Sequence, residues 1–335
     1  MNITRHLSAQ PDLVQQDFEY LIKRDTKSLI SEFPIMFTNS CIVVGGVITH
    51  RSETGFLHTV SWCELAGASP KISYPFLLFS HLSCYNHCLV KYHKKVAITF
   101  GKITKEVEGA NMKPYISIKS LGVFSYFVYL ALILRDKEAL AFYPQIQLQL
   151  KLEFQAEIGY DDRHYDARSR YVWCNFLQAI CKGNTENILS QIDFVFFFED
   201  NEDKKVLPTH TTYDDFVADT TTPFSMGYPL TQYQKGDKEA LQTPLLRVFQ
   251  SIYQEDTEGF NKNLIIALEK HKLYYSSNDI YNESRNSDPY GWVSIPLVAA
   301  CAIAHDKGMK REVTSDYIPE WLVKGEFEGL ELVVE

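Results

Sequence analysis

A short pattern that occurs three times constrains the fold of this chain more than any other feature. In LALILRDKEALAFY, LQAICKGNTENILSQ and FQSIYQEDTEGFNKNL, an apolar helix end is followed by a polar turn and a new helix start. Each new helix opens on a side chain that can accept hydrogen bonds from unpaired backbone amides, and a glutamate follows in the first turn, where it favours the positive helix terminus. The candidate N-caps are Asp136, Asn184 and Asp256, and the glutamates are Glu138, Glu186 and Glu258.

These three units predict helix–turn–helix hairpins packed side by side. Their N-caps are 48 and then 72 residues apart, so they do not form a clean repeat of about 34 residues. The fold class predicted is therefore mainly α, an array of helical hairpins with a small β-hairpin insertion near 95–119.

The expected organisation is a single helical domain over 1–335, with an N-terminal helical half at 1–94, a β-like insertion at 95–119 and a C-terminal helical half at 120–335. Helices are expected over 12–33, twice within 35–68 with breaks near 45–46 and 50–52, and from Pro75 to about His93. Alternating β-branched residues in VAITFGKITKEV and YISIK, separated by EGANMKP, predict the β-hairpin. Residues 191–236 are predicted to be a long acidic loop, whose front either ends a helix or forms a short strand.

The chain carries 42 acidic and 33 basic residues, a formal net charge of −9. This balance does not suit a nucleic-acid backbone or an anionic membrane, so neither is expected as a partner. The seven cysteines are an odd number and are scattered, which indicates reduced, buried thiols and a cytoplasmic location. No secretory signal pattern is visible, and the most apolar stretch, 121–134, is typical of a buried helix because it is too short to cross a bilayer.

One group of side chains invites an interpretation as a metal site. In HLSCYNHC, His81, Cys84 and Cys88 share one helix face and could, together with His87, in principle hold zinc. Four side chains within eight residues of a straight helix rarely close a tetrahedron, and the two cysteines continue an apolar stripe. Packing is therefore favoured over metal binding.

A second group, GYDDRHYDARSR at 159–170, could form an acid–base site. The favoured interpretation is the charged start of a helix, with Asp161 or Asp162 as its cap and Asp166–Arg170 as an i,i+4 pair. The sequence contains no phosphate-binding glycine loop, nucleophile elbow, metalloprotease helix or zinc ribbon. We therefore expect no enzymatic activity, no metal and no cofactor.

The negative charge is distributed unevenly. Residues 193–219 contain eight acids and two lysines, a charge of −6, with aromatic residues interleaved. Such a surface suits a basic protein partner, because charge speeds the encounter and a buried ring supplies affinity. A solvated loop with its phenylalanines turned into the core fits the sequence equally well. The partner-binding residues expected from the first interpretation are Glu199, Asp200, Glu202, Asp203, Tyr213, Asp214, Asp215, Phe216 and Asp219.

An apolar run near the end of the chain, 292–305, predicts a helix that is buried nearly all round. Pro296 would lie in its first turn, where proline is tolerated. His305 and Lys307 complement the negative helix end, and Gly308 supplies the left-handed residue that ends a helix. His305 beside Asp306 therefore needs no catalytic role, although a pH-sensitive contact remains open. The downstream residues expected to cover the preceding elements are Tyr317, Ile318, Trp321 and Leu322.

The stretch AIAHDKG followed by SDYIPEWLVKGEF resembles the C-terminal signature of the immunity protein 49 family, an apolar helix followed by a (S/T)DY(L/I)P segment and a short tail. The preceding LLRVFQSIYQEDTEGFNKNLIIAL is similar to the helical hairpin pattern of that family. The resemblance covers 234–327 and is weaker over 95–190. The matching residues are Ala302, Ala304, His305, Gly308, Asp316, Tyr317, Ile318 and Pro319.

The resemblance implies a mostly α-helical, non-enzymatic protein that is encoded beside a secreted bacterial toxin and protects its producer. Such a protein would bind the cognate toxin domain and occlude its active site or substrate path. The shared residues are expected to be scaffold, with Gly308 as cap, Pro319 as turn, and Tyr317 and Trp321 as packing. The contact surface should then lie elsewhere, which favours the acidic segment. The alternatives are a helical scaffold or regulator that binds an endogenous basic peptide, and an enzyme that uses one of the two clusters above.

Overall fold

The computed structural model describes residues 1–6, 19–20, 22–28, 48–100, 103–109, 115–116, 121–148, 163–200, 238–276 and 285–330. Most of these residues are helical, which confirms the mainly α class. They group into two compact units, each assembled from separate stretches of the chain. The first unit comprises Met1–Pro114, Tyr129–Arg135 and His271–Glu335, and the second comprises Tyr115–Val128 and Asp136–Lys270. The predicted single domain over 1–335 stays a prediction.

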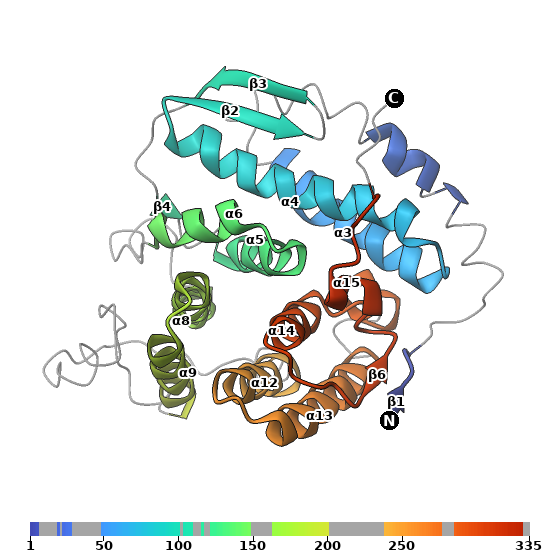
Figure 1. The fold of residues 1–335 in the computed structure, drawn as a ribbon, viewed down its shortest axis with the longest axis vertical. Coiled ribbons are helices and arrows are strands. Elements are labelled where there is room, and N and C mark those ends of the chain that lie inside the picture. Colours follow the sequence, from blue (N-terminus) through green and yellow to red (C-terminus); the bar gives the residue numbers. More distant parts are fainter. Residues whose placement is uncertain are drawn as a thin grey trace, which may run out of the picture. The chain divides into compact units, whose positions relative to one another are not determined.

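Figure 1 shows the elements of each unit. The first unit contains β1 (Asn2–Ile3), α3 (Ile48–Leu65), α4 (Pro70–Tyr92), β2 (Lys95–Phe100), β3 (Ile103–Glu108), η6 (Arg285–Ser287), η7 (Pro289–Gly291), α14 (Ile295–Asp306), β6 (Thr314–Ser315) and α15 (Glu320–Lys324). The second contains β4 (Tyr115–Ile116), α6 (Lys137–Phe142), η3 (Tyr143–Gln145), β5 (Gln147–Leu148), α8 (Arg163–Lys182), α9 (Thr185–Asp200), the π-helical turn η5 (Lys238–Gln242) and α12 (Thr243–Tyr253). Two helices contribute to both units, α5 (Leu121–Leu134) and α13 (Thr257–Ser276).

The three predicted turns are confirmed in atomic detail. The cap oxygens of Asp136, Asn184 and Asp256 each accept a hydrogen bond from the backbone amide three residues later, at 3.0, 2.9 and 2.8 Å. The residue before each cap has a left-handed backbone, with φ of 56° at Arg135, 72° at Gly183 and 57° at Glu255. Each turn therefore combines one left-handed residue, which reverses the chain direction, with one side chain that caps the start of the next helix. The sequence pattern identified the caps but not the reversals, because arginine and glutamate seldom adopt this conformation.

Aromatic side chains and one buried amide hold the core of the second unit. Phe176 on α8 meets Phe249 on α12 edge to face, with ring centroids 5.3 Å apart, and both rings are fully buried. The buried side chain of Gln178 donates hydrogen bonds to the carbonyls of Tyr143 and Ile146, at 2.9 and 2.7 Å. The carbonyl of Tyr143, at the start of η3, also accepts from the amide of Ile146, so the Gln178 side chain adds a second bond to it and pairs the carbonyl that follows η3.

In the first unit, α3 and α4 pack against each other through aromatic rings and thiols. Phe56 contacts Phe79 edge to face at 5.2 Å, and Cys63, Cys84 and Cys88 are buried on the same two helices. Burial raises the pKa of Cys63 to about 12, so this thiol stays protonated. None of the six cysteines in the described residues forms a disulfide and five of them are buried, which agrees with the prediction of buried, reduced thiols.

The predicted helix boundaries in the N-terminal half need correction. Residues 19–20 and 22–28 are helical, within the helix expected over 12–33. The break predicted near 50–52 is wrong, because α3 runs through these polar residues, whose helix propensities are ordinary. The break predicted at 45–46 lies outside the described residues. Helix α4 begins at Pro70 rather than Pro75, because proline suits the first turn, and Pro75 lies inside the helix, where it removes one backbone hydrogen bond.

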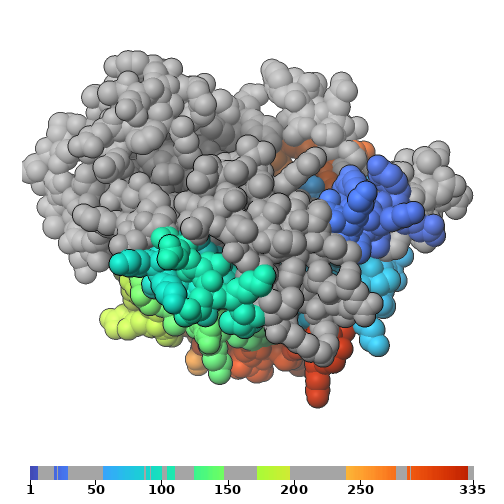
Figure 2. All heavy atoms as spheres, turned by 90° about the horizontal axis from the view of Figure 1, so that it is seen from above, coloured from blue at the N-terminus to red at the C-terminus, as the bar shows by residue number. Residues whose placement is uncertain are grey.

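The β-hairpin is present but shorter than predicted. Strands β2 and β3 pair antiparallel, and only residues 101–102 separate the paired Phe100 and Ile103. Glycine at 101 was the relevant signal, since a two-residue hairpin loop favours glycine. The expected turn EGANMKP is wrong, because the following strand β4 pairs in parallel with β5 instead. Figure 2 shows the hairpin on the face that is seen from above.

The helices decide two further predictions. Residues 191–200 are the last ten residues of α9, so the front of the acidic segment ends a helix, as one of the two predicted alternatives had it, and it belongs to α9 rather than to the loop; 201–237 lie outside the described residues. Helix α14 begins at Ile295 rather than Trp292, because Pro296 at the helix start sets its first turn. Its end is as predicted, with Gly308 at φ 73°.

The helix α5, which is fourteen residues long, was predicted to be buried, and this is confirmed: six consecutive residues from Phe127 to Leu132 lie in the core. None of the helices in the described part of the chain combines the length and the apolar character needed to span a bilayer.

Replacing each cap with alanine tests the role of the turns. We expect Asp136→Ala, Asn184→Ala and Asp256→Ala each to lower the free energy of unfolding by about 1 kcal/mol, since one amide at each helix start loses its partner. Chemical denaturation measures this, with the exposed Glu138→Gln as a control that should change stability by less than about 0.5 kcal/mol. Equal effects of caps and control would contradict the assignment.

Candidate functional site

The structure describes two of the nine predicted partner-binding residues. Glu199 and Asp200 are the last two residues of α9. Glu202, Asp203, Tyr213, Asp214, Asp215, Phe216 and Asp219 lie outside the described residues. Partner binding by this set therefore stays a prediction.

The aromatic residues on the preceding turns of α9 are used inside the second unit. Phe194 is fully buried, and the guanidinium of Arg247 on α12 lies over the ring of Phe196, 3.8 Å from its centroid. Asp193, which directly precedes Phe194 on α9, is exposed. For Phe194, the interpretation of a ring turned into the core is thus the one that the structure supports.

A connected polar cluster lies instead in the first unit, where the two ends of the described chain meet. We call residues 1–6 the N-terminal strap. Its strand β1 pairs in parallel with β6, with Asn2 opposite Thr314 and Ile3 opposite Ser315. The amide of Thr314 donates to the carbonyl of Met1 at 2.9 Å, and the Ser315 hydroxyl donates to the carbonyl of Ile3 at 2.7 Å. The strap therefore runs in register along the DYIP segment.

Tyr317 is the centre of this cluster. Its hydroxyl accepts a hydrogen bond from the backbone amide of His6 at 2.7 Å and lies 2.8 Å from His6 Nδ1. Because the hydroxyl has one proton, it can donate to Nδ1 only when that nitrogen is unprotonated. The geometry thus fits a neutral His6 with its proton on Nε2. The side chain of Tyr317 is fully buried, as predicted, and burial raises its pKa to about 12.

A second buried histidine lies on the other side of Tyr317. His271, on α13, contacts the ring of Tyr317 edge to face at 4.8 Å, and its Nε2 lies 3.1 Å from the carbonyl of Gly291. Tyr275 stacks on His6 at 6.0 Å and also contacts His271 at 4.7 Å. Gly291 is required here, since a Cβ would lie 2.3 Å from the Tyr275 ring.

Burial dominates the electrostatics of both imidazoles. It lowers the pKa of His6 to about 4, with help from the nearby positive charge of Arg5, and it lowers the pKa of His271 to about 4. Both side chains are therefore neutral at pH 7. In this form Nδ1 of His6 can accept from the Tyr317 hydroxyl, and Nε2 of His271 can donate to the carbonyl of Gly291.

Arg5, the charged side chain of the strap, contacts the residue before Tyr317. Its backbone amide donates to the Asp316 carboxylate at 3.2 Å, and its guanidinium donates to the Asp316 carbonyl at 2.5 Å. Glu64 on α3 is a second neighbouring carboxylate, and its Oε1 accepts from the indole of Trp321 at 3.0 Å. Both acids near Arg5 therefore already have partners.

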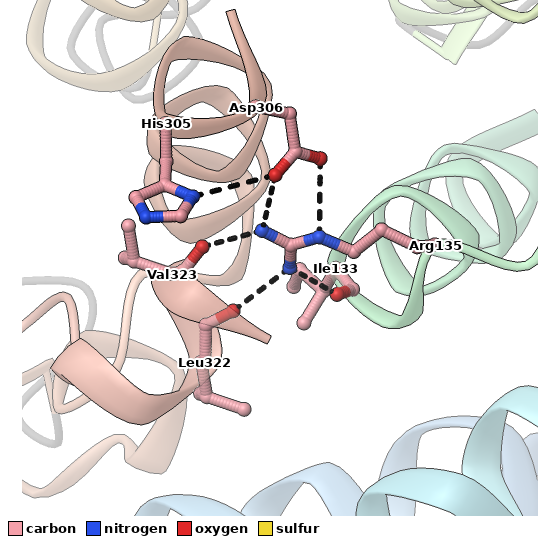
Figure 3. A network of polar contacts seen from close by, with 6 residues as sticks. All are labelled: Ile133, Arg135, His305, Asp306, Leu322 and Val323. Carbon is pink, nitrogen blue, oxygen red and sulfur yellow. Dashed lines mark hydrogen bonds and ion pairs between the residues drawn. The ribbon is translucent and has the colours of Figure 1, made fainter. Parts of the chain in front are cut away.

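Arg135 forms the second polar network of the first unit (Figure 3). Its guanidinium binds the Asp306 carboxylate at the end of α14 through two hydrogen bonds of 3.1 Å. It also donates to the carbonyls of Leu322 at 3.1 Å and Val323 at 2.5 Å, in the last turn of α15. One planar fork thus satisfies carbonyls at the end of α15 and ties them to a carboxylate at the end of α14. His305 lies beside Asp306 at 3.4 Å and is half exposed, which leaves its predicted role as helix-end complement intact.

The described residues of the two side-chain clusters that the sequence offered as candidate metal and acid–base sites lie within helices. His81, Cys84 and Cys88 lie buried in the middle of α4, as the packing interpretation requires. Helix α8 begins at Arg163, inside the charged stretch 159–170, which agrees with a helix start. Asp161 and Asp162 lie outside the described residues. Within the described ranges, no group of three His, Cys, Asp or Glu side chains is placed to hold a metal ion.

Sequence reasoning identified Tyr317 and Trp321 as packing residues but missed the strap and the two histidines. The strap residues pair with residues 311 positions away, and a two-residue strand has no periodicity to recognise. Arg135 was missed for a similar reason, since its partners lie 171 to 188 positions away.

Comparison with known proteins supports the resemblance seen in the sequence. The family model of immunity protein 49 matches residues 209–322, and this is the family that the sequence was found to resemble. Searches of curated proteins and of solved structures give no significant match. The matched range includes α12, α13, α14 and β6, and therefore Tyr317, His271 and Asp306.

A pair of substitutions separates the contribution of the Arg135 side chain to stability from the cost of its left-handed backbone conformation. Arg135→Gly should lower the free energy of unfolding by about 2 to 3 kcal/mol, because the carbonyls of Leu322 and Val323 lose their donor. Glu255→Gly, at the equivalent left-handed position of another turn, should instead raise it by up to about 1 kcal/mol, because glycine adopts this conformation without strain. Urea denaturation measures both. Stabilisation by Arg135→Gly would show that the network contributes little.

Proposed function

We propose that this chain is an immunity protein that binds a cognate secreted toxin and neutralises it by occluding the active site or substrate path. The observation that carries the proposal is the match of the immunity protein 49 model to residues 209–322. The helical scaffold, and the positions of residues 81–88 and 163–170 of the two clusters within helices, are consistent with a stoichiometric inhibitor that performs no reaction of its own.

The toxin-binding surface we propose is the acidic segment that starts at the end of α9. Tyr317, Ile318 and Leu322 in the matched range are buried, so these positions are scaffold rather than contact surface. Discrimination between toxin variants then requires a surface elsewhere. Residues 193–219 carry a charge of −6, which would steer a toxin with a basic surface toward this site.

Protection of cells is the direct test of this function. The chain and the toxin encoded beside it are co-expressed, survival is measured, and binding of the purified pair is measured by calorimetry. We expect survival together with a one-to-one complex at micromolar concentration or below. Cell death with no complex would refute the proposal, and binding to an endogenous basic protein without protection would favour the scaffold alternative.

The acidic surface is tested separately from the function. We expect the quadruple variant Glu199→Gln, Asp200→Asn, Glu202→Gln and Asp203→Asn to slow association with the toxin about tenfold at low salt, because steering falls with charge. The control neutralises the same number of exposed acids elsewhere, at Glu239, Glu269, Glu326 and Glu328. Stopped-flow rates across ionic strength measure both. Equal slowing by both variants would assign the effect to net charge and remove the acidic segment from the interface.

A further inference from the structure

Within the described residues, one of the contacts that hold the strap to the first unit depends on a neutral histidine, the contact between His6 Nδ1 and the Tyr317 hydroxyl. The strand pairing of β1 with β6 spans only two residues on each side. Beyond β1, the polar contacts of the strap are those of Thr4 with Lys272, of Arg5 with Asp316 and of His6 with Tyr317. Two of these contacts meet at the Tyr317 hydroxyl.

We propose that the strap is an acid-sensitive latch, in which protonation of His6 releases residues 1–6 and uncovers the buried face of Tyr317. The inference concerns regulation of the fold and does not depend on the identity of the toxin.

The first argument is the hydrogen-bond geometry at Tyr317. In the closed latch the hydroxyl accepts from the His6 amide and donates to Nδ1, so both groups are satisfied. Protonated Nδ1 is a donor, and the hydroxyl proton then has no acceptor in this pair. A buried donor without a partner is unfavourable.

The second argument is the charge that surrounds His6. The cations Arg5 and Lys272 both lower its pKa, and the second imidazole, His271, lies against the same two tyrosine rings. The carboxylates in the region are Asp316, which binds Arg5, and Glu64, which binds the Trp321 indole. The acceptor that faces His6 from η6 is the carbonyl of Asn286. A new positive charge would therefore meet two cations and no carboxylate that is not already engaged.

The third argument explains which element moves. His271 lies within the twenty-residue helix α13 and is buried, so it cannot leave without unfolding that helix. His6 lies in the strap, whose strand pairing with β6 spans only two residues. Opening of the strap is thus the least costly way to hydrate a protonated imidazole.

The sign of the effect follows from the pKa of His6. It is about 4 in the closed latch and 6.5 for a solvated imidazole, so protons bind more strongly to the open state. The closed latch is fully stable above pH 6.5 and loses stability as the pH falls toward 4. At pH 5 this linkage favours opening by about 30-fold relative to pH 7.4.

Hydrogen exchange measured by mass spectrometry on the whole chain tests the latch. After correction for intrinsic exchange, we expect protection of the strap amides to fall by about 30-fold between pH 7.4 and pH 5, while α12 and α14 stay protected. His6→Asn keeps an acceptor near the position of Nδ1 without titrating, and it should abolish the fall. The control His305→Asn changes an exposed histidine and should leave the fall unchanged.

Several results would overturn the proposal. One is that the strap amides are as well protected at pH 5 as at pH 7.4, and another is that they lose protection only together with α12 and α14. A third is that protection still falls in the His6→Asn variant, which would point to Glu64 or another group. Imidazole ¹⁵N spectra of the unaltered chain provide a test that needs no variant. His6 should change from the neutral Nε2–H form to imidazolium over the pH range in which the strap amides lose protection, and a neutral His6 in the released strap would also overturn it.

Discussion

Unpaired backbone groups at helix ends are the constraint on which the described fold depends. A protein made mainly of helices has many such ends, and each needs a hydrogen-bond partner once it is buried. At three turns, a left-handed residue and a capping side chain meet this need within four residues of chain. At the end of α15, the guanidinium of Arg135 does so from a distance, and it also binds the Asp306 carboxylate at the end of α14.

The same requirement explains why the DYIP segment is scaffold. Tyr317 receives the amide of His6 and packs between two histidine rings, so its side chain is committed to holding the strap. Trp321 is likewise committed to Glu64. A surface that must distinguish one toxin from another cannot be built from side chains that the fold itself uses, which is why we place toxin binding outside this segment.

Much of the local structure could be predicted from sequence, because a cap and the amide it serves are three residues apart. Asp136, Asn184 and Asp256 were found in this way, as was the end of α14 at Gly308. Boundaries set by packing were less accurate, as the uninterrupted α3 and the shortened β-hairpin show. The nine candidate contact residues could be proposed from charge alone, but charge does not say where a side chain points.

The sequence by itself determined that this protein is helical, where its hairpins turn and which family its C-terminal part resembles. Only the tertiary structure decided that the strap lies beside β6, that His6 and His271 enclose Tyr317, and that Arg135 joins α14 to α15. The physical reason is distance along the chain. Caps act on neighbours within one turn, whereas these contacts join residues that only a completed fold brings together.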